Sequence, residues 1–276
     1  MKKLSDRVAV VTGAAGGIGR ATSVALAKEG CHLALCDVNA AGLDETAALA
    51  REHGRTVTTH IVDVSNKERM RAFAEEVVAQ HGGVNILVNN AGVTVAAPFE
   101  NHSLEDFEWI VGINLWGVIY GCKFFLPYLQ KADEAHIVNL SSLFGLLGVP
   151  SQTSYCATKF AVHGFSEALW VELRDQGIGV TSVHPGGVRT DIAKSARTTS
   201  SAQKSLAIDI IERFSVTPEH CAKLIVSAIK KNKMKQMVTR ETHMIFAAKR
   251  LAPQLPQRVM VGGYRRTKKL EAGNGK

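Results

Sequence analysis

The stretch Arg7-Val-Ala-Val-Val-Thr-Gly-Ala-Ala-Gly-Gly-Ile-Gly19 decides the fold. Residues 7–12 form a short β-rich run with an apolar centre at 8–11, as in a buried parallel strand. A glycine-rich segment follows directly, and beyond it apolar residues recur at helical spacing until Gly30. A dinucleotide site requires this order of strand, glycine turn and helix, because glycines let the backbone approach a pyrophosphate and a helix N-terminus offers free N–H groups. The spacing is Gly-x3-Gly-x-Gly rather than the usual Gly-x-Gly-x2-Gly, so the prediction depends on the position after a first strand.

A second strand is predicted over 32–37, and it ends in an acid, Asp37, 18 residues after the last glycine of the turn. A carboxylate at that place can bind the hydroxyls of an adenosine ribose and would repel a 2′-phosphate. Neither Arg nor Lys stands at Ala15, Val38 or Asn39 to accept such a phosphate. We therefore predict NAD(H) rather than NADP(H) as the cofactor, and the alternative is an Asp that only caps the strand end.

Strands and helices alternate along the rest of the chain, which predicts an α/β fold. We expect a single Rossmann-like, doubly wound domain over 1–240, with a seven-stranded, mostly parallel sheet and helices on both faces. The apolar stretch 110–129 contains Asn114, Lys123 and Pro127, so it is expected to be a buried helix rather than a membrane span. The further strands are predicted over 56–62, 85–89, 135–140, 178–184 and 236–239, and the further helices over 40–53, 66–80, 104–131, 154–175 and 218–231.

Polar side chains gather where the predicted strands end. Asp63 stands where it could reach an adenine edge, or it could cap the helix that follows. The run Asn89-Asn-Ala-Gly92 could line a ligand crevice or stabilise a turn. Asn114 lies among apolar residues of a long helix, and a buried amide is costly unless it has a partner.

The segment Ser154-Tyr-Cys-Ala-Thr-Lys159, with Ser142 upstream, carries the most specific chemistry. At the start of a helix, Tyr155 and Lys159 would lie one turn apart on one face. An ammonium group favours a phenolate, so we expect the pKa of Tyr155 to fall from about 10 towards neutrality. Such a phenol can accept a proton from an alcohol or donate one to a carbonyl, while the hydroxyl of Ser142 holds the substrate oxygen.

Taken together, these segments resemble the short-chain dehydrogenase/reductase family over residues 5–240. The run 12–19 is similar to the cofactor motif of that family, and 89–92 is similar to its central-strand motif. The catalytic positions of the family are matched by Asn114, Ser142, Tyr155 and Lys159. Its nicotinamide-contacting segment is matched by Pro185, Gly186, Val188 and Thr190.

The resemblance implies an NAD(H)-dependent oxidoreductase that moves a hydride between nicotinamide C4 and a hydrophobic alcohol or carbonyl substrate. Tyr155 would be the acid/base, and Lys159 would lower its pKa and bind the ribose hydroxyls. Ser142 would hold the substrate oxygen, and the amide of Asn114 would hold a water in a proton relay with the lysine. A catalytically silent dinucleotide sensor or scaffold is the alternative, and the intact set of four residues argues against it. No metal is implied.

The implied contacts fall into two sets. Ser142, Phe144 and Tyr155 are expected to touch the substrate. The expected cofactor contacts share a position at the carboxyl edge of the sheet: Gly13, Ala15, Gly16, Gly17, Ile18, Gly19, Asp37, Val38, Asp63, Val64, Asn90, Ala91, Gly92, Tyr155, Lys159, Pro185, Gly186, Val188 and Thr190.

The segment 190–217 is predicted to be an insertion at the substrate entrance. It is rich in Ser and Thr, shows no strand pattern, and contains a short amphipathic helix over 206–214. Insertions at the carboxyl edge of the sheet lie where substrate must enter, although an ordinary surface loop is the alternative. The other expected entrance segments, 94–99 and 143–149, are largely apolar and favour a hydrophobic substrate.

The net charge of +8 belongs to the C-terminal part of the chain, since residues 230–276 hold 13 Lys and Arg against 2 Asp and Glu. This distribution argues against a nucleic-acid binder. The extension 241–276 is predicted to form one or two amphipathic basic helices, interrupted by Pro253 and Pro256. It would either contact an anionic membrane surface or pack on the body, and its end from Lys268 is expected to be disordered.

The cysteines and one helix bear on localisation and assembly. The five cysteines show no paired spacing, which indicates reduced thiols in a cytoplasmic protein. The helix over 154–175 is apolar on more than one face, as a homodimer or homotetramer interface would require.

Overall fold

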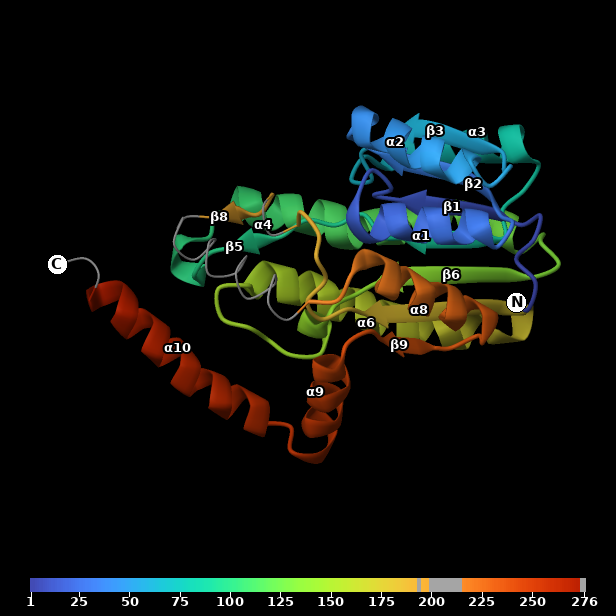
Figure 1. The fold of residues 1–276 in the computed structure, drawn as a ribbon. Helices are drawn as coiled ribbons and strands as arrows, with labels where there is room; N and C mark the ends of the chain where they lie inside the picture. Colours follow the sequence, from blue (N-terminus) through green and yellow to red (C-terminus); the bar gives the residue numbers. More distant parts are fainter. Residues whose placement is uncertain (193–194, 199–214, 274–276) are drawn as a thin grey trace.

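A parallel sheet of seven strands forms the centre of the computed structural model, which describes residues 1–192, 195–198 and 215–273. The strands lie in the order β3-β2-β1-β4-β6-β7-β9 (Figure 1). Every neighbouring pair is parallel, which confirms the predicted doubly wound α/β sheet. The strands are β1 (Val8–Thr12), β2 (His32–Asp37), β3 (Val57–Ile61), β4 (Ile86–Asn89), β6 (Ala135–Leu140), β7 (Ile178–His184) and β9 (Lys235–Met237).

The winding of the chain reverses between β1 and β4. The chain first lays down β1, β2 and β3 on one side, and then returns to the other side of β1 with β4. At such a point the connections leave the two neighbouring strands in opposite directions, so a crevice remains at the carboxyl edge. Gly13 after β1 and Asn90 after β4 lie at this point of the sheet.

Successive side chains of β1 enter two different cores, one on each face of the sheet, because strand side chains alternate in direction. Ala9 and Val11 pack with α1, α2 and α8, whereas Val10 packs with α3, α5 and α6. The predicted helices on both faces are thereby confirmed. The helices are α1 (Gly17–Lys28), α2 (Ala40–Arg51) and α8 (Pro218–Lys230) on one face, and α3 (Lys67–His81), α5 (Gly117–Leu129) and α6 (Thr153–Leu173) on the other.

The long helical region predicted over 104–131 is interrupted by a π-helical segment. Helix α4 (Leu104–Val111) leads into this segment (Gly112–Trp116), and α5 follows. Leu104–Leu129 has the length and the mean hydropathy, 1.4, of a membrane span. Its inner face is part of the core, where Val118 and Phe125 are buried, so the prediction of a core helix agrees with the structure. Single π-turns often mark functional sites, and Asn114 lies at the centre of this one.

A second, two-stranded sheet lies beside the carboxyl edge. In it, β5 (Val95–Ala96) pairs in parallel with β8 (Arg197–Thr198). The prediction that 190–217 lacks strand structure was therefore wrong at this point, because two residues are too few to show a pattern. Arg197 also forms an ion pair of 2.7 Å with Asp106, and its guanidinium lies over the ring of Trp109. The helix predicted over 206–214 lies outside the described residues.

The C-terminal extension consists of α9 (Arg240–Leu251) and α10 (Leu255–Gly273), separated around Pro253 as the sequence predicted. Helix α9 packs on the body through the buried Thr242 and the half-buried Phe246. Helix α10 projects away from the body (Figure 1). It continues to Gly273, where disorder was predicted from Lys268, because Lys, Leu, Glu and Ala favour helix. Residues 274–276 lie outside the described part.

All five cysteines are buried free thiols, in agreement with the prediction of reduced side chains. Burial raises the pKa of the thiols of Cys31, Cys122 and Cys221 to about 12.

Candidate active site

The glycine turn after β1 is closed by tight backbone contacts. Gly13 and Gly17 have φ angles of 64° and 50°, in the left-handed region that favours glycine. A Cβ at Gly19 would overlap the carbonyl oxygen of Gly13, so the start of α1 can approach the turn only without a side chain. Asn90 braces the turn from β4, because its Nδ2 donates to the carbonyls of Thr12 (2.9 Å) and Gly13 (3.0 Å). Of the two sequence interpretations of residues 89–92, this contact supports the stabilised turn.

Gly16 occupies the N-cap position of α1 with an extended backbone, and no side chain caps the helix there. No described atom lies within 4 Å of the point that a Cβ of Gly16 would occupy. The space beside Gly16, at the N-terminus of α1, is therefore open. A pyrophosphate fits such a place in charge and in size.

Asp37 lies at the end of β2, beside the glycine turn. Its Oδ2 accepts from the N–H of Ala15 at 2.9 Å, and its Oδ1 accepts from the N–H of Asn39 at 3.0 Å. A carboxylate can accept about four hydrogen bonds, so it can also take the two hydroxyls of a ribose. Val38, the next residue, is exposed at the mouth of this region.

Arg20 supports the turn in a way that the sequence reasoning missed. Its guanidinium donates to the carbonyl of Ala15 (2.7 Å) and pairs with Glu45 of α2 (2.7 Å). The charge of this guanidinium is therefore already neutralised by Glu45. The signal available in the sequence was a basic residue directly after the last glycine.

Asp63 and Val64, both predicted as cofactor contacts, follow β3, and for Asp63 a helix cap was the alternative. Asp63 Oδ1 accepts from the N–H (2.9 Å) and the hydroxyl (2.7 Å) of Ser65. Asp63 therefore shapes the turn before α3, while Asn66 is the N-cap of that helix. Val64 is buried against Gly117 at the start of α5.

Tyr155, Ser142 and Phe144 meet at the start of α6. The rings of Phe144 and Tyr155 meet edge to face with centroids 5.9 Å apart, and the hydroxyl of Ser142 lies near enough to the phenol to lower its pKa. Ser142 lies directly after β6 and begins the 3₁₀ segment Leu143–Gly145. Burial raises the pKa of Tyr155 to about 12, and the Ser142 hydroxyl only partly opposes this.

The expected fall of the Tyr155 pKa towards neutrality is thus wrong for this structure. Lys159 lies one helical turn on, but its Nζ donates to the carbonyl of Leu140 at 2.9 Å and lies 5.6 Å from the centroid of the Tyr155 ring. Burial lowers the pKa of this amine to about 8. Desolvation dominates the pKa of the phenol, and the ammonium of Lys159, which is turned to Leu140, is not among the groups that lower it. The spacing in the sequence could not reveal this orientation.

Asn114 has the partner that a buried amide requires. Its Oδ1 accepts from the N–H of Val93 (2.8 Å), and its Nδ2 donates to the carbonyl of Val93 (2.9 Å) and to the hydroxyl of Thr158 (3.3 Å). Asn114 Oδ1 and Lys159 Nζ both lie within 3.4 Å of the point that a Cβ of Gly92 would occupy. A glycine at position 92 therefore keeps a small space between the amide and the amine.

The segment after β7 closes the site from the other side. The carbonyl of Pro185 accepts from Leu143, next to Ser142, at 2.7 Å. Gly186 lies close to Thr239, where only a glycine leaves room, and Val188 forms an isolated bridge with Val216. Thr190 lies against Gly17, so this segment reaches the glycine turn. The structure thus brings the predicted residues to one edge of the sheet.

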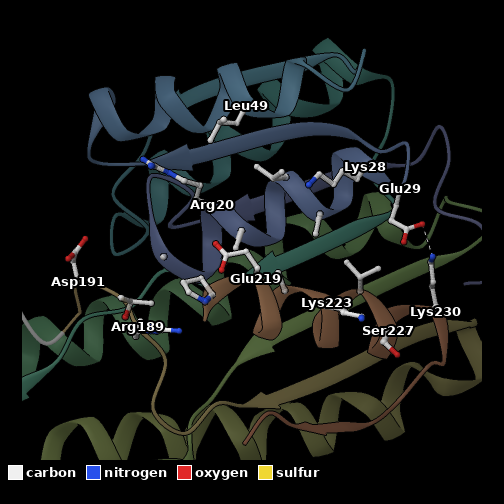
Figure 2. A pocket seen from close by; sticks show the side chains of 18 of the residues that line it. Arg20, Lys28, Glu29, Leu49, Arg189, Asp191, Glu219, Lys223, Ser227 and Lys230 are labelled. Carbon is white, nitrogen blue, oxygen red and sulfur yellow. Dashed lines mark hydrogen bonds and ion pairs between the residues drawn. The ribbon is translucent and has the colours of Figure 1, made fainter. Parts of the chain in front are cut away.

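A groove of about 950 Å³ runs between α1 and α8, behind the glycine turn (Figure 2). Gly17 and Thr190 lie at one end, and the ion pair between Glu29 and Lys230 (2.6 Å) lies at the other. Its lining includes none of the predicted catalytic residues.

Comparison with known proteins agrees with this geometry. The profile of the short chain dehydrogenase family matches residues 7–201. The chain therefore belongs to the short-chain dehydrogenase/reductase family, and it is an oxidoreductase of that class.

Individual relatives and structures are similar over most of the chain. The oxidoreductase SadH of Mycobacterium tuberculosis is 37% identical over 267 residues, which cover 95% of this chain and 97% of SadH. Human epidermal retinol dehydrogenase 2 is 34% identical over 237 residues, which cover 84% and 74%. A short-chain dehydrogenase/reductase from Burkholderia phymatum, solved in complex with NAD, has a TM-score of 0.86 and 30% identity, and the match covers 93% of this chain and 97% of that chain.

Proposed function

We propose that this chain is an NAD(H)-dependent dehydrogenase that moves a hydride between nicotinamide and a hydrophobic alcohol or carbonyl compound. The observation that carries the proposal is the half-buried Tyr155 with the hydroxyl of Ser142 beside it and Lys159 one helical turn away. These groups lie at the same sheet edge as the glycine turn. A phenol, a serine hydroxyl and a lysine are the groups that proton transfer at a carbinol or carbonyl oxygen requires.

The cofactor is held by residues that fit its parts. The open N-terminus of α1 at Gly16 takes the pyrophosphate, and Asp37 takes the adenosine ribose hydroxyls. Asp37 would repel a 2′-phosphate, and the guanidinium of Arg20 is occupied by Glu45, so NAD(H) is preferred over NADP(H). The Burkholderia relative, which is solved with NAD, supports this choice.

When bound, the cofactor would provide the hydride chemistry at its nicotinamide ring. Ser142 donates a hydrogen bond to the substrate oxygen, while Tyr155 accepts the alcohol proton or returns it. Since burial raises the pKa of Tyr155 to about 12, the phenolate needs positive charge near it, from Lys159 and from the oxidised nicotinamide. We assign the space between Asn114 Oδ1 and Lys159 Nζ to the water of the proton relay.

Turnover of the Tyr155→Phe variant tests this proposal. The variant should lose turnover and keep the NAD+ affinity of the wild type, because the ring remains and only the proton-transferring oxygen is lost. Alcohols of rising chain length, together with retinol and steroids, are assayed at 340 nm with NAD+. Retained turnover in the variant would contradict the assignment of Tyr155.

The substrate is proposed to be hydrophobic. Leu143 and Phe144 are half-buried beside Tyr155 and present apolar surface at the site. The two strands β5 and β8 lie where the entrance is expected, and they hold segment 94–99 against the start of the insertion. The similarity to a human retinol dehydrogenase supports a lipophilic alcohol.

Assembly as a homodimer or homotetramer is proposed from a partly exposed aromatic row that begins at Trp116, directly before α5, and continues along α5. Trp116 is 47% exposed and stacks on Tyr120, which stacks in turn on Phe124. A second copy would cover this row and the exposed Phe160 of α6. Light scattering of wild type and of a Trp116→Glu variant tests the interface, and a monomeric wild type would contradict it.

Peripheral contact with an anionic membrane is proposed for the extension of this otherwise cytoplasmic enzyme. Met244, Leu251 and Val259 are each at least 69% exposed. The basic residues Lys249, Arg250 and Arg258 lie between these apolar ones in the sequence, and Arg265 follows them. An exposed helix of this composition binds membranes by apolar insertion and by attraction to anionic lipids.

Co-sedimentation with vesicles tests this contact. The full chain should pellet with phosphatidylserine vesicles and much less with phosphatidylcholine vesicles. Variants Leu251→Ser/Val259→Ser and Arg258→Gln/Arg265→Gln should each lose binding. Absence of pelleting by the full chain would end the membrane proposal.

A further inference from the structure

We propose that His184, supported by His163, is a positioning residue that fixes Ser142 for hydride transfer. This inference rests on the proposed role of Ser142. Neither histidine was given a role by the sequence pattern, which showed no ligand spacing around them.

His184 is the last residue of β7, and it is fully buried. Its Nδ1 lies 3.1 Å from the carbonyl oxygen of Ser142, and its Nε2 lies 2.9 Å from the hydroxyl of Ser182. A carbonyl can only accept, so Nδ1 carries the proton and Nε2 accepts from Ser182. Burial lowers the pKa of His184 to about 3, so the ring is neutral and keeps this tautomer.

The bond from His184 completes a three-point attachment of Ser142. The carbonyl of Ser142 is held by His184, and the next N–H, of Leu143, donates to Pro185 at 2.7 Å. The hydroxyl of Ser142 accepts from the N–H of Phe144 at 3.1 Å. Because His184 and Pro185 are consecutive, the end of β7 sets where the Ser142 hydroxyl meets Tyr155.

His163 holds the other end of the same segment. Its Nδ1 lies 3.2 Å from the carbonyl of Gly145, and its ring meets that of His184 edge to face, with centroids 4.7 Å apart. The two histidines therefore hold the 3₁₀ segment Leu143–Gly145 at its two ends. His184 binds the preceding residue, Ser142, and His163 binds Gly145.

Two charged residues, Glu167 and Lys235, lie next to His163. Its Nε2 lies 3.2 Å from Glu167, without the alignment of a good hydrogen bond. Glu167 also accepts from Lys235 of β9 at 2.8 Å. Glu167 and Lys235 are the charged groups that act on the histidine pair, and they remain in every variant used below.

Substitution of His184 by Asn or by Gln distinguishes the contribution of the Nδ1 hydrogen bond from that of the Nε2 hydrogen bond. Asn can place an amide nitrogen near the position of Nδ1, whereas Gln reaches the position of Nε2. We expect His184→Leu and His184→Gln to lose about 10- to 100-fold in kcat, because a displacement on the order of 1 Å costs about 10²-fold. His184→Asn should stay within roughly threefold of the wild type. The NAD+ affinity should be unchanged in all three.

A double-mutant cycle shows whether His184 acts through Ser142. Ser142→Ala alone should lower kcat by about 10²-fold, and His184→Leu should add little in that background. The acid limb of the kcat profile should also move to higher pH in His184→Leu, because the Ser142 hydroxyl lowers the pKa of Tyr155. Lys159 and Cys156, the other groups near that phenol, are unchanged.

Some results would overturn the inference. Multiplicative effects of His184→Leu and Ser142→Ala would show that the histidine acts independently of the serine. Equal activities of the Asn and Gln variants would remove the bond to Ser142 from the explanation, and this comparison holds even if the Leu variant does not fold. Retained turnover in Tyr155→Phe would instead overturn the proposed function, so the two failures are distinguishable.

Discussion

Replacing Gly16 by alanine should separate cofactor binding from folding. The residue has φ −167° and ψ −178°, an extended conformation that alanine adopts without strain. No described atom lies within 4 Å of the new methyl group, so the free energy of unfolding without cofactor should change by less than about 0.5 kcal/mol. The methyl group would, however, enter the space assigned to the pyrophosphate. One misplaced methylene-sized group costs about 1–3 kcal/mol of binding, or roughly tenfold or more in Kd.

Thermal unfolding with and without NAD+ measures both quantities. At an NAD+ concentration of about 100 times the wild-type Kd, binding stabilises the wild type by about 2.7 kcal/mol. A tenfold weaker Kd reduces this to about 1.4 kcal/mol. For a chain of this size the Tm shifts are then roughly 5–11 °C for the wild type and 3–6 °C for the variant.

Gly83→Ala is the matched control. Gly83 also has no atom within 4 Å of its Cβ position, but it precedes β4, at the opposite edge of the sheet. Its NAD+ shift should equal that of the wild type. An unchanged Kd in Gly16→Ala would refute the position assigned to the pyrophosphate, and a large loss of Tm without NAD+ would refute the open space itself.

Three further predictions follow from other contacts. Asp37→Ser should raise kcat/KM for NADP+ relative to NAD+ by about tenfold or more, since it removes the charge that repels a 2′-phosphate; an unchanged ratio would remove Asp37 from this role. Lys159→Met should gain stability relative to the wild type below pH 8, and denaturant titrations should show this gain shrinking between pH 8 and 10.5. Burial lowers the pKa of Lys159 from 10.5 to about 8 in the folded protein. Between these two pH values the unfolded chain binds one proton more than the folded one, so the wild type becomes more stable as pH rises. A gain in stability that does not depend on pH would contradict the burial of Lys159. Gly121→Ala should destabilise the fold by about 1–3 kcal/mol, because its Cβ would overlap the amide of Asn89, and wild-type Tm would refute this packing.

The order of strands and helices was predictable because each one has a strong local signal. The β1 run alternates between two cores, and its valines and alanines are consistent with burial on both sides. The two residues of β5 and of β8 carry no such signal, since their pairing depends on where the fold brings the backbones. The π-turn at Asn114 was equally invisible, because one extra residue in a helical turn leaves the apolar pattern almost unchanged.

The site residues were predictable as a set, but their electrostatics were not. The spacing of Tyr155 and Lys159 specifies that they share a helix face. It does not specify that the amine points to the carbonyl of Leu140, or that the phenol is buried. The pKa of Tyr155 depends on these two features, so the sequence alone gave the wrong direction. Arg20 and His184 were missed for a related reason, since their partners are backbone carbonyls brought near by the fold.

The burial of all five cysteines makes this protein convenient to label. A maleimide dye would react slowly with thiols that are shielded and remain protonated at neutral pH. A single cysteine introduced at Leu251, which is 88% exposed on α9, would then take up the dye selectively without removal of any native thiol. Slow background reaction of the native thiols would in turn report how often the core opens.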